Sequence, residues 1–161
     1  MASVISVIRF LPHRAALAVG AFLGTVLWAL GKRKVDKAEA RCVSVLGIGI
    51  THARKIIRAS YANMGRSAVE FARMGQLQPR LNSLVSIQGK EYLDEALSRG
   101  KGVLFMTAHI GNWELAGSYL AAQGYSMAAI YTPQRNRGGV EDLIRRQRAE
   151  SVDLNMIPSE G

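Results

Sequence analysis

Residues 103–114 read VLFMTAHIGNWE, and this stretch decides the predicted fold. Its first half is a continuous apolar run, which is typical of a strand buried on both faces of a parallel sheet. The second half places His109 at the end of that strand, Gly111 in a tight turn and Asn112 where a helix N-cap is expected. Glu114 then falls in the first helical turn, where the helix dipole favours a carboxylate. The stretch therefore predicts a strand, a turn and a helix in direct succession.

The alternation of strand and helix continues on both sides of this stretch. Short apolar runs bounded by turn residues predict strands, and apolar residues at three- and four-residue steps predict the helices between them. Such alternation is typical of an α/β domain with a mostly parallel sheet and flanking helices. The chain stops directly after its last predicted strand, so we expect an incomplete sheet in an apparently truncated domain. The predicted strands are residues 84–87, 102–107, 126–131 and 153–157, and the predicted helices are residues 91–99, 114–122 and 139–150.

Residues 15–31 read AALAVGAFLGTVLWALG and contain no charged side chain. As a helix they would span about 25 Å, the short end of the range that crosses a bilayer. The basic run KRKVDK at residues 32–37 follows directly and would suit anionic headgroups. A cleaved signal peptide is disfavoured, because no small-x-small cleavage site precedes that run. A spanning helix, an interfacial helix and a buried helix of a soluble fold all remain open.

A second N-terminal helix is predicted at residues 51–75, with Thr51 as its N-cap and Gly75 at its end. Its apolar side chains recur at helical spacing and leave the basic residues outside the stripe. Gly20 and Gly24 form a G-x-x-x-G face, which by itself is weak evidence of helix pairing. We expect a membrane-associated helix region at residues 1–34 and the N-terminal part of an α/β domain at residues 35–161.

Composition limits the classes of function. Hydrophobic residues make up 48% of the 161-residue chain, which excludes a disordered polar protein. Lys and Arg number 21 against 12 Asp and Glu, a net charge of +9, so the partners are expected to be anionic. The basic residues are scattered and lack an aromatic stacking platform, which disfavours a nucleic-acid partner. The single cysteine, Cys42, excludes an internal disulfide and CxxC-type metal sites, and no metal site is predicted.

His109 and Glu114 could do chemistry, because ligand sites of open α/β sheets lie beyond the carboxyl ends of the strands. A carboxylate at one ring nitrogen would fix the tautomer, and the other nitrogen could then take a proton from a hydroxyl. Spacing alone does not settle the matter, since a histidine at a strand end followed by a capping glutamate is more often structural.

The string from Gly102 to Glu114 resembles the H-x4-D/E motif of the lysophospholipid acyltransferase superfamily. Its H-x-G-N-W-E form is similar to the bacterial lipid A biosynthesis (lauroyl/myristoyl) acyltransferase branch. The resemblance extends over nearly the whole chain, through residues 11–14, 63–70, 86–93, 131–136, the basic helix ending at 148, and 156–161.

The resemblance implies roles for particular residues. His109 would be the general base and Glu114 its orienting partner, while Arg135, Asn136 and Arg148 would bind substrate. Arg148 matches the family arginine if one inserted residue is allowed after Asn136. The chain departs from the family at residue 132, where threonine stands in place of the usual arginine.

The resemblance also implies a reaction and a location. A fatty acyl chain would pass from acyl-carrier protein to a hydroxyl of a lipid A precursor, with no metal and no cofactor beyond that co-substrate. The partners would be acyl-carrier protein, an anionic glycolipid and the cytoplasmic face of a bacterial inner membrane, with no nucleic acid. Two alternatives stay open: transfer to another lysophospholipid or glycolipid, and a non-catalytic protein that binds anionic membranes.

Overall fold

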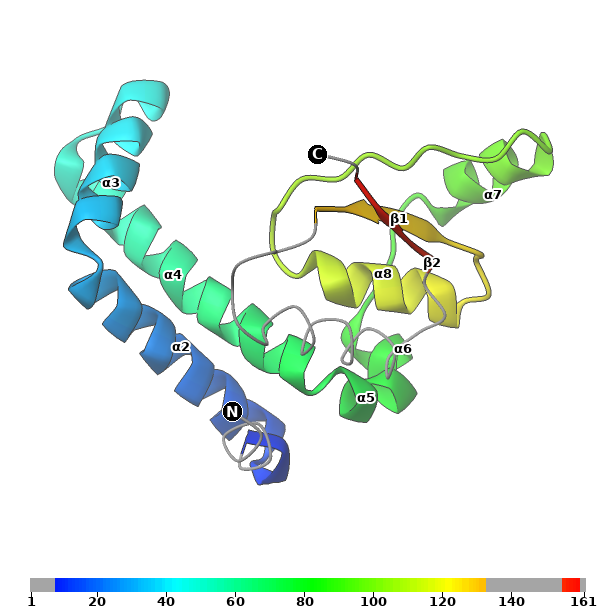
Figure 1. The fold of residues 1–161 in the computed structure, drawn as a ribbon, viewed down its shortest axis with the longest axis horizontal. Helices are drawn as coiled ribbons and strands as arrows, with labels where there is room; N and C mark the ends of the chain where they lie inside the picture. Colours follow the sequence, from blue (N-terminus) through cyan, green and yellow to red (C-terminus); the bar gives the residue numbers. More distant parts are fainter. Residues whose placement is uncertain (1–7, 133–154, 160–161) are drawn as a thin grey trace. The chain divides into compact units, whose positions relative to one another are not determined.

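The computed structural model describes residues 8–132 and 155–159 of the chain. The chain divides into two compact units, Met1–Arg73 and Met74–Gly161 (Figure 1). The predicted domain boundary at residue 34 falls inside a helix of the first unit.

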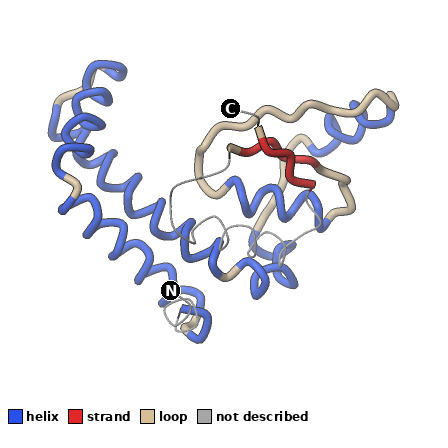
Figure 2. The backbone as a smooth tube through the Cα atoms, in the orientation of Figure 1, coloured by secondary structure: helices blue, strands red, loops and turns tan. Residues whose placement is uncertain are grey.

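The first unit is built from three long helices: α2 (His13–Leu30), α3 (Lys32–Leu46) and α4 (Ile50–Ala72). Helix α2 runs antiparallel to α4, because Gly20 lies against Gly65 while Gly24, further along α2, lies against Tyr61. Figure 2 shows α3 continuing from α2 and turning back into α4. The apolar run at residues 15–31 therefore forms a helix, as predicted, and it packs along a basic amphipathic helix.

Glycine determines how closely α2 and α4 approach. A Cβ placed on Gly20 would lie 2.5 Å from the Gly65 carbonyl oxygen and 2.8 Å from Cγ2 of Val69. A Cβ on Gly24 or Gly65 would meet the opposite backbone at under 3.0 Å. The G-x-x-x-G face thus pairs two helices of the same chain, with backbone against backbone.

Two predicted ends of the 51–75 helix are wrong. The N-cap of α4 is Gly49, whose extended backbone leads into the helix, and Thr51 lies inside it. The helix ends at Ala72, and Gly75 belongs to the short helix α5 (Met74–Leu77). Thr51 and Gly75 match common end signals, but α4 begins at Ile50 and ends before Gly75.

The second unit begins with α5, the 3₁₀ helix η1 (Gln78–Arg80) and α6 (Leu81–Leu84). It continues with α7 (Lys90–Ser98), α8 (Trp113–Ala122), β1 (Ala128–Tyr131) and β2 (Asn155–Pro158). The helices at residues 91–99 and 114–122 are confirmed to within one residue at each end. Buried side chains of the first three elements and α8 form its core: Met74, Leu77, Leu81 and Leu120.

The strands form one parallel pair, in which Ala128 is opposite Asn155 and Tyr131 opposite Pro158. They correspond to two of the four predicted strands, residues 126–131 and 153–157, and the described residues, which are mainly helical, show no larger parallel sheet. Residues 84–87 contain the end of α6 and then irregular chain, and residues 102–107 are irregular (Figure 2). Residues 102–107 are also exposed. A strand needs hydrogen bonds from a neighbouring strand, and β1 and β2 pair with each other. The helix predicted at residues 139–150 lies outside the described residues.

Candidate active site

His109 lies in the irregular segment that joins α7 to α8, immediately before the α8 N-terminus. A tight turn presents it, since the Ile110 N–H donates to the Ala108 carbonyl oxygen at 2.8 Å and Gly111 takes a positive φ of 62°. The imidazole is exposed, and its centroid is 4.5 Å from that of the Trp113 ring, with the planes at 53°. The first residue of α8 therefore supports one side of the histidine and leaves the rest accessible.

The local signals for the start of α8 are confirmed. Asn112 is the N-cap, and its Oδ1 accepts a hydrogen bond from the Leu115 N–H at 3.1 Å. Glu114 lies in the first turn and is half-buried. Its side chain is thus held at the start of α8, next to the residue that contacts His109.

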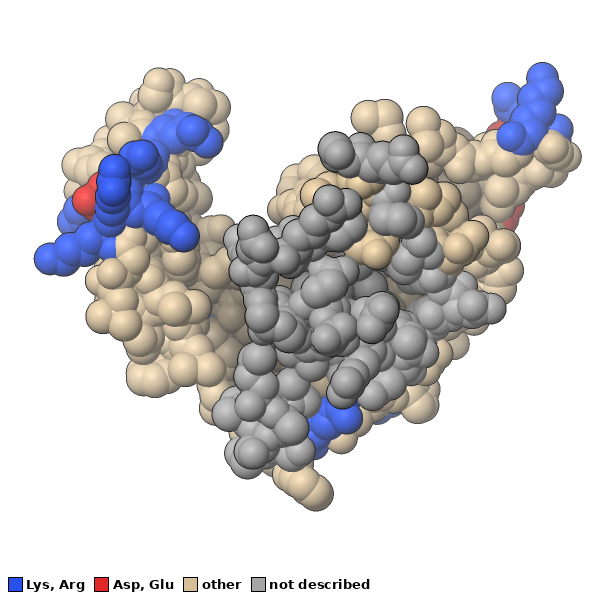
Figure 3. All heavy atoms as spheres, in the orientation of Figure 1, with Lys and Arg blue, Asp and Glu red and all other residues tan. Residues whose placement is uncertain are grey.

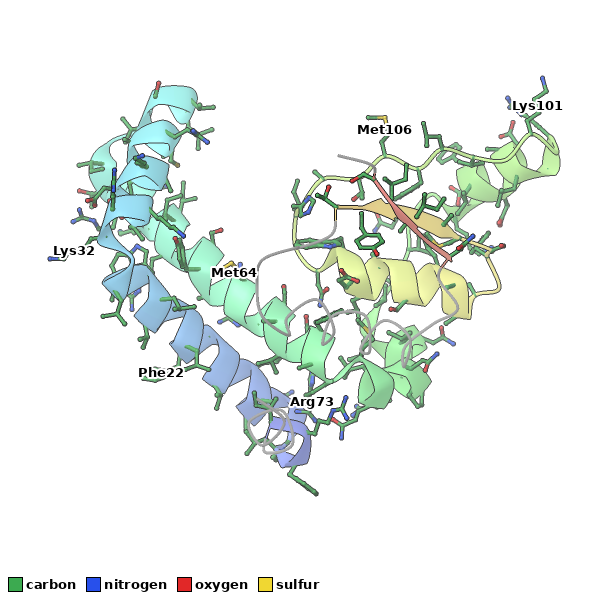
Figure 4. All side chains as sticks on the ribbon, viewed as in Figure 1. Phe22, Lys32, Met64, Arg73, Lys101 and Met106 are labelled. Atoms are coloured by element: carbon green, nitrogen blue, oxygen red, sulfur yellow. The ribbon has the colours of Figure 1, made fainter. Side chains whose placement is uncertain are left out.

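The segment before His109 differs from the buried strand that was predicted. Leu104 and Met106 are 86% and 87% exposed, and Phe105 is also exposed. Figure 4 shows Met106 projecting away from the chain. The segment presents an apolar surface directly before the histidine, which the sequence pattern assigned to a sheet interior.

The structure describes two of the five predicted site residues, His109 and Glu114. His109 and Glu114 both lie at the α8 N-terminus, where the ring of His109 contacts Trp113, and their action as a dyad stays a prediction. Arg135, Asn136 and Arg148 lie outside the described residues, so their roles also stay predictions.

The structure brings together two hydroxyls to which the sequence analysis gave no role. Thr132 Oγ1 lies 3.1 Å from Ser159 Oγ, just beyond the carboxyl ends of β1 and β2. The Ser159 N–H donates to the Tyr131 carbonyl oxygen at 2.8 Å, which extends the ladder by one bond. Ligands often bind beyond the carboxyl ends of parallel strands. Thr132, which departs from the family pattern, lies at such a position.

Two further features bear on function. Among residues 8–132 and 155–159, no group of three or more His, Cys, Asp or Glu side chains could hold a metal ion. Helix α2 is long and apolar enough to cross a membrane by length and composition, a property shared with core helices and signal sequences.

Comparison with known proteins places the chain in a family. The model of the bacterial lipid A biosynthesis acyltransferases matches residues 1–161. A phosphatidylinositol mannoside acyltransferase of Mycolicibacterium smegmatis is 31% identical over 109 residues, which are 66% of this chain and 34% of that protein. The chain therefore covers about a third of that relative's length. No solved structure matches the chain. Since the family match runs from the first residue to the last, the chain belongs to the bacterial lipid A biosynthesis acyltransferase family.

Proposed function

We propose that this protein transfers a fatty acyl chain from acyl-carrier protein to a hydroxyl of a lipid A precursor. The observation that carries the proposal is the accessible imidazole of His109, held against Trp113 at the α8 N-terminus. His109 takes the proton of the acceptor hydroxyl, whose oxygen attacks the thioester carbonyl carbon. The new C–O bond forms, the C–S bond breaks, and the proton passes from His109 to the departing thiolate.

Glu114 supports this chemistry through the histidine. A carboxylate in the first turn of α8 can orient the imidazole and stabilise the imidazolium that forms during proton transfer. A thiolate is already a good leaving group, so the proposed reaction uses no metal or cofactor. Arg135, Asn136 and Arg148 are proposed to bind the phosphorylated acceptor, since the two guanidinium groups match phosphate oxygens and the Asn136 amide can donate to them.

A second acceptor class is favoured by one specific finding. The similar mycobacterial protein is named a phosphatidylinositol mannoside acyltransferase. Transfer to a related glycolipid is therefore the alternative, with the same roles for His109 and Glu114. Parallel assays with a lipid A precursor and a mannosylated phosphatidylinositol separate the two acceptors.

The N-terminal unit is proposed to hold the protein at the cytoplasmic face of the inner membrane. Apolar side chains of α2 are exposed, among them Phe22, Leu27 and Leu30. Figure 3 shows Lys and Arg side chains gathered over α3. The exposed cations of its first turns are Lys32, Arg33, Lys34 and Lys37, which suit anionic headgroups.

The test compares acyl transfer by the variants His109→Ala, Glu114→Ala and the double variant, in the longest natural form that contains this chain. A general base contributes about 10²–10⁴ in rate, so His109→Ala should lose transfer by that factor. His52→Ala is the matched control, because His52 is an exposed histidine on α4. Losses that do not multiply in the double variant would indicate a dyad.

Near wild-type transfer by folded His109→Ala would remove the catalytic assignment. Fully multiplicative losses would leave two functional residues that do not act together. Retained vesicle binding by a wild-type protein with no transfer to either acceptor would favour the non-catalytic alternative.

A further inference from the structure

Helices α2 and α4 border a shallow, open groove of about 490 Å³ that has both cationic and apolar walls. Its lining from α4 includes Lys55, Arg58 and Arg66, and its lining from α2 includes Phe22 and Thr25. The three cations are exposed and lie along one face of α4, at steps of three and eight residues. The groove thus offers three positive charges beside the most apolar helix of the unit.

In the described part of the chain, the salt bridges join other cations, Arg54, Lys90 and Arg99, to carboxylates. The guanidinium of Arg58 lies over the Trp28 ring, with its Cζ 5.6 Å from the centroid. The Nη1 of Arg66 donates to Oδ1 of Asn63 at 2.6 Å, which is a neutral amide. Arg54, by contrast, pairs with Glu39 on the α3 side of the same helix. The cations that face the groove remain available for an anion.

The other side of the same helix pair is apolar. A groove of about 260 Å³ there is lined by apolar side chains, including Leu23, Leu27 and Met64. Phe22 is 67% exposed and projects outward from α2 (Figure 4). An anion in the cationic groove would therefore lie beside the exposed Phe22 of α2, which fits a lipid headgroup better than a nucleic acid.

The close packing of α2 on α4 limits the orientations that the pair can take in a bilayer. Gly20 and Gly24 hold the middle of α2 against α4, and Arg9, which precedes α2, donates to the Ala72 carbonyl oxygen at the end of α4. If α2 crossed the bilayer, it would bring the charged side chains of α4 into the hydrocarbon region, where each is costly. If α2 lies in the interface plane, those side chains can stay among the headgroups.

We propose that the α2–α4 pair lies flat in the membrane interface, with anionic phospholipid headgroups bound in the groove of Lys55, Arg58 and Arg66. Helix α2 is the deeper of the two, and the α4 cations reach the phosphates. This inference rests on the membrane association proposed above, and it chooses an interfacial over a spanning α2.

The first experiment measures flotation of the chain with phosphatidylglycerol–phosphatidylcholine vesicles. The test variant replaces the three groove cations by Gln. The control replaces Arg80, Arg99 and Lys101, which are exposed cations of the second unit, and changes the net charge equally. A basic residue near an anionic surface changes binding by about fivefold, so the groove variant should bind on the order of a hundredfold more weakly. The control should lose much less.

The second experiment places single cysteines at Arg14 and Lys32, the two ends of α2, in a Cys42→Ser background. A membrane-impermeant maleimide is added outside vesicles that carry the bound protein. An interfacial α2 leaves both cysteines equally reactive before detergent is added. Protection of one end until detergent is added would overturn the flat arrangement.

The remaining outcomes separate the proposals. A wild-type chain that does not float would overturn membrane association and this inference together. A groove variant no weaker than the control would overturn the inference alone. Tighter binding to polyuridine RNA than to vesicles, lost in the groove variant, would assign the groove to nucleic acid instead.

Discussion

Replacing Gly20 by alanine should loosen the α2–α4 pair. The new Cβ would lie 2.5 Å from the Gly65 carbonyl oxygen, about 0.9 Å short of the 3.4 Å at which ordinary contact begins. The obstacle is backbone, which cannot rotate away as a side chain can. The two helices must therefore separate by most of that distance, and the buried Ala16 and Val69 beside the contact lose packing.

The expected change is a balance of two effects. Overpacking a tightly fitted contact costs about 1–3 kcal/mol, and a backbone obstacle places this case at the upper end. Alanine gains about 1 kcal/mol over glycine within a helix. The free energy of unfolding of the first unit should therefore fall by about 2 kcal/mol. Gly65→Ala should cost at least as much, because its Cβ would meet both the Gly20 carbonyl oxygen and the Gly24 nitrogen.

Urea denaturation followed by Trp28 fluorescence measures this change. The chain has two tryptophans, so a Trp113→Phe background leaves a probe in α2 alone. The control is Gly75→Ala, a helical glycine with no atom within 4 Å of the added Cβ, which should keep or raise stability. If Gly20→Ala is as stable as the control, the close packing of α2 on α4 is refuted.

Three further predictions concern single contacts. Asn112→Ala should cost about 1 kcal/mol by removing the α8 N-cap, and unchanged urea unfolding followed by circular dichroism would contradict the capping role. Arg54→Ala should cost about 1–3 kcal/mol because it leaves the buried carboxylate of Glu39 without its partner, whereas adding Glu39→Gln should recover part of the loss, as thermal unfolding would report. The hydrogen bond from the Lys90 ammonium lowers the pKa of Asp94, so its small contribution is present above about pH 4 and is lost as pH falls through the lowered pKa. Asp94→Asn should remove that acid sensitivity from the thermal midpoint, and an unchanged pH profile would show that the pair does not affect stability.

Local signals in the sequence were enough to predict helices α2, α4, α7 and α8, but not α3. The apolar run at residues 15–31 formed α2, and helices appeared at residues 50–72, 90–98 and 113–122. Asn112 capped α8 because its side chain reaches an amide only three residues away. Such interactions join residues within one or two helical turns, so a sequence pattern can predict them. The family motif around His109 was likewise readable without a structure.

Tertiary structure decided what depends on distant neighbours. The apolar run at residues 102–107 has the composition of a buried strand, yet it is irregular and exposed, because a strand exists only where another strand supplies its hydrogen bonds. The pairing of β1 with β2 joins residues more than twenty positions apart, and no periodicity encodes that choice. Gly20 and Gly24 suggested a pairing face, but only the fold identified Gly65 and Tyr61 of α4 as its partner. Each of these contacts is set by which distant backbone comes within a few ångströms, and that depends on the packing of whole elements.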